Sequence, residues 1–250
     1  MVAGLQNKTK VAFIIQARMR SERLPGKVLM PMPLANGKPL IQWIVDELNK
    51  SSFKKKVVLA TSVNTENDVI YDYCIKHSIN CYRGDEDDVL SRYIEILKIE
   101  NFDAVVRLTG DNPLIDISLL EKSIEYHLIN KNDYTYTSGL PLGMNFEIIS
   151  PLALLSLERV LTTNEEKEHV TLFIRKSKKY NKGEITLTDN SIIKNLRLTV
   201  DYPSDYLVVS QVLAFCEYFS SDKLSGIEKM LTRFPWIFNE NAKNIQKGIP

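Results

Sequence analysis

The sequence predicts an α/β fold in which a doubly wound, mostly parallel sheet is covered by helices on both faces. Short β-branched runs alternate with helical stretches from residue 11 onwards, a rhythm typical of βαβ units. These runs are apolar on both faces, as expected for strands buried on both sides. The chain has 250 residues, of which 44% are hydrophobic and 25% charged, so a single globular domain spanning 1–250 is predicted.

Five strands are predicted in the first part of the chain from their apolar, β-branched character. They span residues 11–16, 56–61, 80–82, 103–108 and 134–138. Between them, apolar residues three or four positions apart predict helices over 40–49, 66–77, 89–100 and 119–129. Capping boxes are expected at two of the helix starts: Thr65 with Asp68, and Ser118 with Glu121.

After residue 138 the rhythm changes, and we expect a small additional α+β lobe at about 140–200. Within it, a strand is predicted around 145–149, two helical stretches over 151–178, and a further strand over 196–200 (LRLTV). Tyr202 and Pro203 are expected to open the next helix. Residues 1–9 are expected to form an N-terminal tail, and about 220–250 a C-terminal helical tail.

Overall charge and composition exclude several function classes. The chain has 32 Lys+Arg against 31 Asp+Glu, a formal charge of +1, which argues against a partner such as nucleic acid. The apolar runs are far shorter than the roughly 20 residues of a membrane-spanning helix, so no membrane partner is expected. Three cysteines without a CxxC pair support neither a disulfide framework nor a zinc site. A cytoplasmic location is therefore predicted.

The loop after the first predicted strand is the most informative segment. Its four cations lie within ten residues: Arg18, Arg20, Arg23 and Lys27. Such a loop can hold a polyphosphate, and Gly26 lets backbone N–H groups approach it. Neither GxGxxG nor GxxxxGK[ST] is present, so a dinucleotide fold or a Walker-type NTPase gains no support. The alternative is a solvated basic loop.

The carboxyl ends of the predicted strands should share one edge of the sheet, where ligands bind in such folds. Asp111, in a TGDNP turn, and Asp201, in VDYP, each follow a predicted strand. Carboxylates suit Mg²⁺, which is usually bound by one or two of them together with phosphate oxygens. The alternative is an Asx turn at Asp111 and a helix N-cap at Asp201. The acidic run at 85–88 favours a first helical turn over a second metal site.

The segment QARMRSERLPGK at 16–27 resembles the signature of the cytidylyltransferases that activate sugars. That family includes the enzymes that make the CMP derivatives of 3-deoxy-manno-octulosonate and of acylneuraminate, and the nearest branch is the spore coat polysaccharide biosynthesis type, SpsF. The resemblance covers about residues 10–215, in order. It continues through GKPL (37–40), VLATS (58–62), RGDEDDVL (83–90), VRLTGDNPLID (106–116), EHVT (168–171) and LRLTVD (196–201).

The resemblance implies a glycosyltransferase-A-like nucleotidyltransferase fold and the transfer of CMP from CTP to a sugar, acidic in character, for surface polysaccharide biosynthesis. The implied triphosphate ligands are Arg18, Ser21, Arg23, Gly26 and Lys27, with Arg18 and Lys27 acting in catalysis. Contacts to cytosine and ribose are implied for Ala17, Thr61 and Arg83, and Gly84 beside Arg83 is expected to contact the ligand. Asp111 and Asp201 match the positions that hold Mg²⁺.

Acceptor recognition is implied for Glu147 and His169, in the lobe at about 140–200. For His169 the alternative is a hydrogen-bonded packing histidine. This lobe would bind the acceptor or form a homodimer, although burial within one chain explains its apolar content equally well. Asn145 in GMNFE replaces an acid of the branch, which leaves acceptor specificity open. Two other function classes also remain: a glycosyltransferase that uses a nucleotide sugar, for which TGDNP is an unusual metal motif, and a non-catalytic nucleotide-binding protein.

Overall fold

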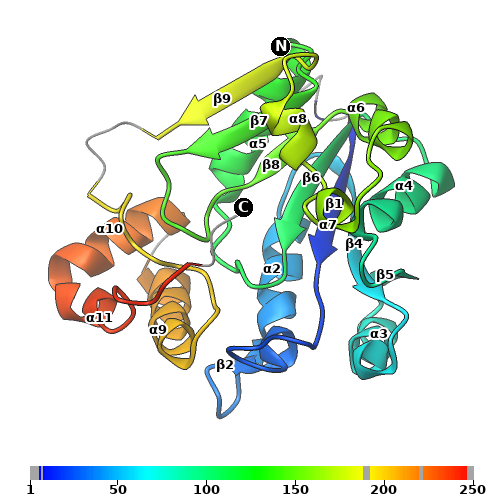
Figure 1. Ribbon diagram of the computed structural model, residues 1–250. Coiled ribbons are helices and arrows are strands. Elements are labelled where there is room, and N and C mark those ends of the chain that lie inside the picture. Colours follow the sequence, from blue (N-terminus) through cyan, green and yellow to red (C-terminus); the bar gives the residue numbers. More distant parts are fainter. Residues whose placement is uncertain (1–5, 7, 188–191, 220–221, 247–250) are drawn as a thin grey trace.

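The computed structural model describes residues 6, 8–187, 192–219 and 222–246. Most of the tail expected at 1–9, and residues 220–221 and 247–250 of the tail expected at 220–250, lie outside this part of the chain. Within it, seven strands form one sheet in the order β5-β4-β1-β6-β8-β7-β9 (Figure 1). Their bounds are β1 Lys10–Gln16, β4 Lys54–Ser62, β5 Asn80–Gly84, β6 Ala104–Thr109, β7 Tyr134–Ser138, β8 Glu147–Ile149 and β9 Lys182–Thr186.

The sheet is mostly parallel, as predicted. Strand β8 alone among the seven described strands runs opposite to its neighbours, β6 and β7, while the remaining pairs are parallel. Each face of the sheet is buried. In β1, Val11, Phe13 and Ile15 belong to one apolar cluster, and Ala12 and Ile14 belong to another. Successive side chains of a strand point to opposite faces of the sheet. A strand that is apolar at every position therefore buries both faces, as the sequence predicted for a sheet covered by helices on both sides.

Helices cover both faces. Those packed on the first apolar cluster include α2 (Leu40–Asn49), α5 (Ile117–Ile129) and α9 (Pro203–Phe219). Those packed on the second include α4 (Val89–Ile99), α6 (Pro151–Ser156) and α8 (Leu172–Lys176). The remaining helices are α3 (Asp68–Lys76), α7 (Asn164–Glu168), α10 (Lys223–Arg233) and α11 (Pro235–Asn239). Figure 1 shows α9, α10 and α11 grouped on the side away from α3 and α4.

Short elements complete the fold. The two-residue strands β2 (Pro31–Met32) and β3 (Lys38–Pro39) pair in an antiparallel hairpin. Three 3₁₀ turns are described: η1 (Lys27–Leu29), η2 (Thr65–Asn67) and η3 (Leu157–Arg159). No helix in the described ranges is long and apolar enough to cross a membrane. The cysteines are free thiols.

Two predicted helix starts were wrong. Helix α5 begins earlier than expected, because the Asp116 carboxylate accepts a hydrogen bond from the Leu119 N–H at 2.9 Å and so takes the capping role given to Ser118. A 3₁₀ turn precedes α3 at the position of the other expected capping box. At α3 the N-cap position is taken by Asn67, whose side chain makes no capping hydrogen bond.

The segment 196–200 is extended but is not a strand of the sheet. It makes one isolated bridge, between Arg197 and Leu142. Its alternate residues Leu198 and Val200 are fully buried, which reproduces a strand-like pattern, while Arg197 turns toward buried carboxylates. The strand that does extend the sheet here is β9, whose KGEIT sequence has a weak apolar pattern because β9 lies at the edge.

The two helical stretches expected over 151–178 are instead α6, η3, α7 and α8, all short. The break between α7 and α8 contains Val170, whose φ is 47°. A β-branched residue in the left-handed region is strained, and Val170 is fully buried there. The EHVT motif therefore forms a fixed turn rather than part of a continuous helix.

Candidate active site

The cationic loop folds back on itself and directs Lys27 inward. Gly26 has φ 73°, a left-handed conformation that only glycine adopts at little cost. Its N–H donates to the Met19 carbonyl at 3.0 Å, which closes the loop. Lys27 follows as the first residue of η1, and only 8% of it is exposed. That backbone N–H groups around Gly26 can approach a polyphosphate stays a prediction.

The Lys27 ammonium joins the two carboxylates that were predicted to act together. Its Nζ donates to Asp111 Oδ2 at 2.8 Å, to Asp201 Oδ1 at 2.9 Å and to the Val200 carbonyl at 2.8 Å. These three bonds use every proton of the ammonium group. Burial would raise the pKa of Asp111, but the charge of Lys27 and its hydrogen bond lower that pKa overall. Asp111 is therefore ionised at neutral pH.

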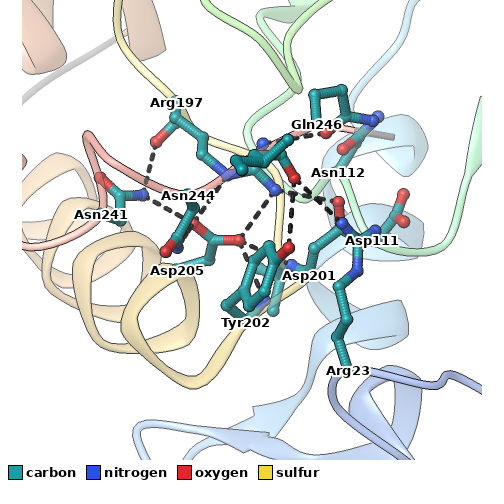
Figure 2. Close-up of polar contacts among 12 residues, drawn as sticks. Arg23, Asp111, Asn112, Arg197, Asp201, Tyr202, Asp205, Asn241, Asn244 and Gln246 are labelled. Atoms are coloured by element: carbon teal, nitrogen blue, oxygen red, sulfur yellow. Dashed lines mark hydrogen bonds and ion pairs between the residues drawn. The ribbon is translucent and has the colours of Figure 1, made fainter. Parts of the chain in front are cut away.

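Asp201 binds two further cations. The Arg23 guanidinium lies 3.0 Å from Asp201 Oδ1, and Arg197 Nη2 donates to Asp201 Oδ2 at 3.0 Å. Figure 2 shows Arg23 and Arg197 reaching Asp201 from opposite sides. Arg23 also lies over the Tyr202 ring, 4.8 Å from its centroid, and donates to the Ile245 carbonyl at 3.2 Å. The predicted phosphate-binding arginine is thus held by a carboxylate and by the C-terminal segment.

Beneath these groups lies Asp205, a fully buried carboxylate that sequence reasoning missed. Each of its oxygens accepts three hydrogen bonds (Figure 2). The donors are Arg197 Nε and Nη2, the backbone N–H groups of Asp201 and Tyr202, and the Nδ2 atoms of Asn241 and Asn244. Its signal in the sequence was an acid at the third position of α9, where carboxylates accept from free N–H groups.

Burial would raise the pKa of Asp205, but its bonds from Arg197, Asn244 and the backbone lower that pKa overall. Asp205 therefore fixes Arg197, and Arg197 in turn fixes Asp201. The arrangement shows that the C-terminal segment, which donates through Asn241 and Asn244, helps to build the site.

Arg18 and Ser21 lie in the same loop but do not join Lys27. The Arg18 side chain is 52% exposed and its Nη1 donates to Glu86 at 3.3 Å. Ser21 is half-buried. Glu86 belongs to the acidic run, in which Asp88 caps α4 by accepting from the Ser91 N–H at 2.9 Å. The acidic run was expected to form the first helical turn, but it precedes the helix instead: α4 begins at Val89, and only Asp88 takes part, as its N-cap.

At the carboxyl ends of three adjacent strands, buried polar atoms lack a partner among the described residues. They are Gln16 Oε1 at the end of β1, Thr61 Oγ1 in β4 and Asn112 Oδ1 just after β6. Such an atom costs about 1–3 kcal/mol when it stays unpaired, and native folds keep few of them. Gln16 and Asn112 were not predicted as site residues, although both belong to motifs that flank predicted ones.

The other residues predicted near the nucleoside are more firmly tied to the protein. The Ala17 N–H donates to the Ala60 carbonyl at 3.1 Å. Arg83 donates from Nε to the Ser62 carbonyl at 3.1 Å and from Nη2 to Asp68 at 2.6 Å, and the Gly84 carbonyl accepts from the Val63 N–H at 2.9 Å. Arg83 and Gly84 therefore shape the loop that follows β4.

Glu147 and His169 lie on the sheet face covered by α4, α6 and α8. Glu147 accepts from Arg107 Nη1 at 2.7 Å, from the Thr171 hydroxyl at 3.0 Å and from the Tyr134 hydroxyl. Burial would raise the pKa of Glu147, but Arg107 and these hydroxyl donors lower that pKa overall. His169 is half-buried in the turn between α7 and α8, two residues from Thr171.

Among the described residues, the carboxylates of Asp111 and Asp201 are a pair of side chains suited to Mg²⁺. In the described part of the chain there is no group of three or more His, Cys, Asp or Glu side chains suited to a metal. Asp111 and Asp201, however, converge on a single cationic atom, Lys27 Nζ. Two carboxylates suffice for Mg²⁺ when phosphate and water complete its shell, and the Asp111 side chain is 25% exposed.

A doubly wound sheet with a cationic loop after its first strand, facing two carboxylates at the same edge, has the features of a nucleotidyltransferase. A family model described as cytidylyltransferase matches residues 12–221. The chain therefore belongs to the cytidylyltransferase family, and it is a CTP-dependent nucleotidyltransferase. The resemblance seen in the sequence motifs is confirmed.

Individual relatives agree with this assignment. The chain is 35% identical over 202 residues to the spore coat polysaccharide biosynthesis protein SpsF of Bacillus subtilis (strain 168), a match that covers 78% of this chain and 83% of that protein. It is 30% identical over 174 residues to a 3-deoxy-manno-octulosonate cytidylyltransferase of Psychrobacter sp. (strain PRwf-1), covering 67% and 58%. The structure of a cytidylyltransferase from Leptospira borgpetersenii serovar Hardjo-bovis (strain JB197) superimposes with a TM-score of 0.81 at 28% identity, covering 96% and 99%.

Proposed function

We propose that this enzyme transfers CMP from CTP to an acidic sugar, with release of pyrophosphate, for surface polysaccharide or glycoconjugate biosynthesis. The observation that carries the proposal is the convergence of Lys27, Asp111 and Asp201 on one point beside the cationic loop. The relatives named above, a spore coat polysaccharide protein and an octulosonate cytidylyltransferase, support a sugar as the acceptor.

In this reaction an acceptor oxygen attacks the α-phosphorus as the bond to the pyrophosphate oxygen breaks. Phosphoryl transfer asks for little covalent chemistry from the protein, so positioning and charge stabilisation dominate. Lys27 and Arg18 would neutralise charge on the phosphate oxygens. Arg23, Ser21 and the backbone at Gly26 would hold the rest of the triphosphate, which requires Arg23 to exchange the Ile245 carbonyl for a phosphate oxygen.

Asp111 and Asp201 would hold Mg²⁺, which when bound supplies positive charge to the phosphate oxygens. Their oxygens already bind the Lys27 ammonium, so Lys27 and the metal would compete for the same carboxylates. Arg197 keeps Asp201 in place from its other oxygen, at 3.0 Å. The nucleoside would lie against Ala17 and Thr61, with the unpaired Thr61 hydroxyl oxygen available to it.

The test is a screen of pyrophosphate release with CTP, UTP, ATP and GTP against a panel of acidic and neutral sugars, with and without Mg²⁺. We expect release with CTP, Mg²⁺ and at least one acidic sugar. Lys27→Met should lose this activity, while Lys55→Met, at a lysine on the strand end away from the site, should keep it. Absence of pyrophosphate in every combination contradicts the proposal. A parallel set of reactions supplies a ready-made nucleotide sugar in place of the free nucleotide, and product formed only there identifies a glycosyltransferase instead.

A further inference from the structure

A hollow lies between α8 and the edge of the sheet, away from the candidate active site. Its volume is about 590 Å³, within the range of about 300–1,000 Å³ that is usual for small-molecule sites. One wall is the side of α8 that carries Leu172, Arg175 and Lys176, since residues three and four positions apart share one side of a helix. The floor is formed by β7 and by β9, the outermost strand of the sheet (Figure 1).

The floor of the hollow presents an aromatic ring. Tyr136 stands opposite Glu184 in the register of β7 and β9, and Tyr134 stands opposite Lys182. Tyr134 is fully buried and stacks against the half-buried Tyr136, with 5.8 Å between the ring centroids. The buried ring therefore holds the Tyr136 ring in place at the floor.

The cations around this ring are available to a ligand. Arg175 and Lys176 are exposed, and neither side chain makes a hydrogen bond or ion pair with a described residue. Lys182 Nζ donates to the carbonyls of Arg175 and Ser177, both at 2.9 Å. These two bonds tie β9 to the end of α8, and they leave the third proton of the ammonium group for a ligand.

The charges and shape of the hollow fit an acidic sugar. Three cations line it against one carboxylate, Glu184, so it attracts an anion. A hydrogen bond to Glu184 raises the pKa of Tyr136, and the nearby charge of Arg175 acts in the opposite direction, which places both charges beside the ring. An aromatic ring packs against the apolar face of a sugar, and a guanidinium binds a carboxylate through two parallel hydrogen bonds.

Glu184 decides between the two common kinds of anion. Its carboxylate accepts hydrogen bonds, which suits the hydroxyl groups of a sugar. Its charge opposes a doubly charged phosphate more strongly than a singly charged carboxylate. A sugar that carries a carboxylate is therefore favoured over a sugar phosphate.

The hollow is separate from the place of CMP transfer. Tyr136 is level with Arg107 on β6, through Glu147 on the strand between them. Arg107 lies four residues before Asp111, and β7 is two strand spacings from β6, so Tyr136 lies roughly 15 Å from the Asp111 backbone. A single sugar packed on Tyr136 is too far from Asp111 to be the group that receives CMP.

We propose that the hollow between α8 and β9 is a second saccharide-binding site, which holds an acidic sugar by its carboxylate on Arg175 and Lys176 and by its ring on Tyr136. Glu184 accepts from the hydroxyl groups of the sugar, and Lys182 holds the two walls together. The same carboxylate chemistry is offered by a free sugar acid and by an acidic residue within a glycan. This inference does not depend on the transfer reaction.

Calorimetric titration of the whole chain, without nucleotide, tests the proposal. The probes are galacturonate, N-acetylneuraminate, tetragalacturonate, the neutral sugar galactose and inorganic phosphate. We expect at least one of the three acidic probes to bind and galactose not to bind. The Kd should rise with added NaCl, because salt screens exposed charges. Tighter binding of tetragalacturonate than of galacturonate identifies a glycan as the source, and equal or weaker binding identifies a free sugar acid.

Variants locate the binding in the hollow. Arg175→Gln should raise the Kd of the acidic probe at least about fivefold, and Tyr136→Leu, which removes the aromatic face, should also weaken binding. The matched control is Lys178→Gln, at an exposed lysine just after α8 and outside the hollow, which should leave the Kd unchanged. Arg175→Gln should melt at the temperature of the wild type, because the exposed side chain has no partner among the described residues.

Four results overturn the inference: no acidic probe binds, galactose binds as tightly as the acids, phosphate binds more tightly than every acid, or Arg175→Gln binds the acid as the wild type does. Each of them leaves the proposed function standing, because that function is measured by pyrophosphate release. Failure of pyrophosphate release, in turn, leaves this binding site standing.

Discussion

Replacing Asp205 by Asn should disrupt the hydrogen bonds that hold Arg197, and through it Asp201, in the candidate site. The substitution keeps the shape of the side chain but turns one acceptor oxygen into an NH₂ donor. Each oxygen of Asp205 accepts three hydrogen bonds in the described structure, so the new NH₂ group would face three donors, whichever way the amide turns. Arg197 would also lose a buried charged partner at 2.9 Å.

The expected cost follows from these contacts. Breaking a buried ion pair by removing one partner costs about 3–5 kcal/mol, so we expect the free energy of unfolding of Asp205→Asn to fall by about that amount near pH 7. Urea unfolding followed by circular dichroism measures it, with an unchanged m-value as the sign that the denatured state is the same. The exposed Asp72 provides the control: Asp72→Asn should stay within about 0.5 kcal/mol of the wild type.

The pH dependence gives a second check. Since the pKa of Asp205 is lowered in the folded protein from its ordinary value of 3.8, its stabilisation is fully present above the unfolded pKa and is lost as the pH falls through the folded pKa. The gap between wild type and Asp205→Asn should therefore narrow below about pH 4. A loss under about 1 kcal/mol near pH 7, too small for a broken buried pair, or a gap that stays constant in acid, would refute this account of Asp205.

Other residues give shorter predictions. Lys27→Met should lower the rate of pyrophosphate release by about 10²- to 10³-fold. It should also destabilise the protein, because Asp111 and Asp201 then face each other without their shared cation. A rate within threefold of the wild type, measured with CTP and the acceptor, contradicts the prediction for Lys27. Asp111→Asn should shift the magnesium titration of that rate to higher concentration, and an unchanged titration removes Asp111 from the metal site. Burial lowers the pKa of His127 from 6.5 to about 4, so the folded protein should lose about 3 kcal/mol as the pH falls between these values, and His127→Gln should flatten that part of the urea-stability curve.

Local sequence patterns were enough to predict the strands and helices up to residue 138 and the cationic loop. The five strands and four helices predicted up to residue 138 all exist, because each is defined by apolar spacing within a few neighbouring residues. The strand predicted over 134–138 and the helix predicted over 40–49 have the bounds of β7 and α2. The cationic loop could be recognised for the same reason: Gly26 and Lys27 are neighbours in the chain, and the turn between them is a local event.

The contacts within the candidate site were harder to predict from the sequence, because they join residues that lie far apart in the chain. Lys27 meets Asp111 and Asp201 across 84 and 174 positions, and Asp205 receives its bonds from Asn241 and Asn244 at 36 and 39 positions. No periodic pattern encodes such pairs. Strand-like alternation at 196–200 predicted a strand that does not form: the segment makes one isolated bridge to Leu142, and Arg197 pairs with Asp201 and Asp205, four and eight positions further along the chain.

The amino-acid sequence by itself determined the α/β class, the order of most elements and the loop that carries the cations, since these follow from short-range apolar spacing and backbone preference. The tertiary structure alone decided which charges meet. It inserted β8 out of chain order between β6 and β7, which set Glu147 against Arg107, and it brought the C-terminal segment under Asp201. Electrostatic and hydrogen-bond energies act at distances of a few ångströms, so they are defined only after the chain has folded.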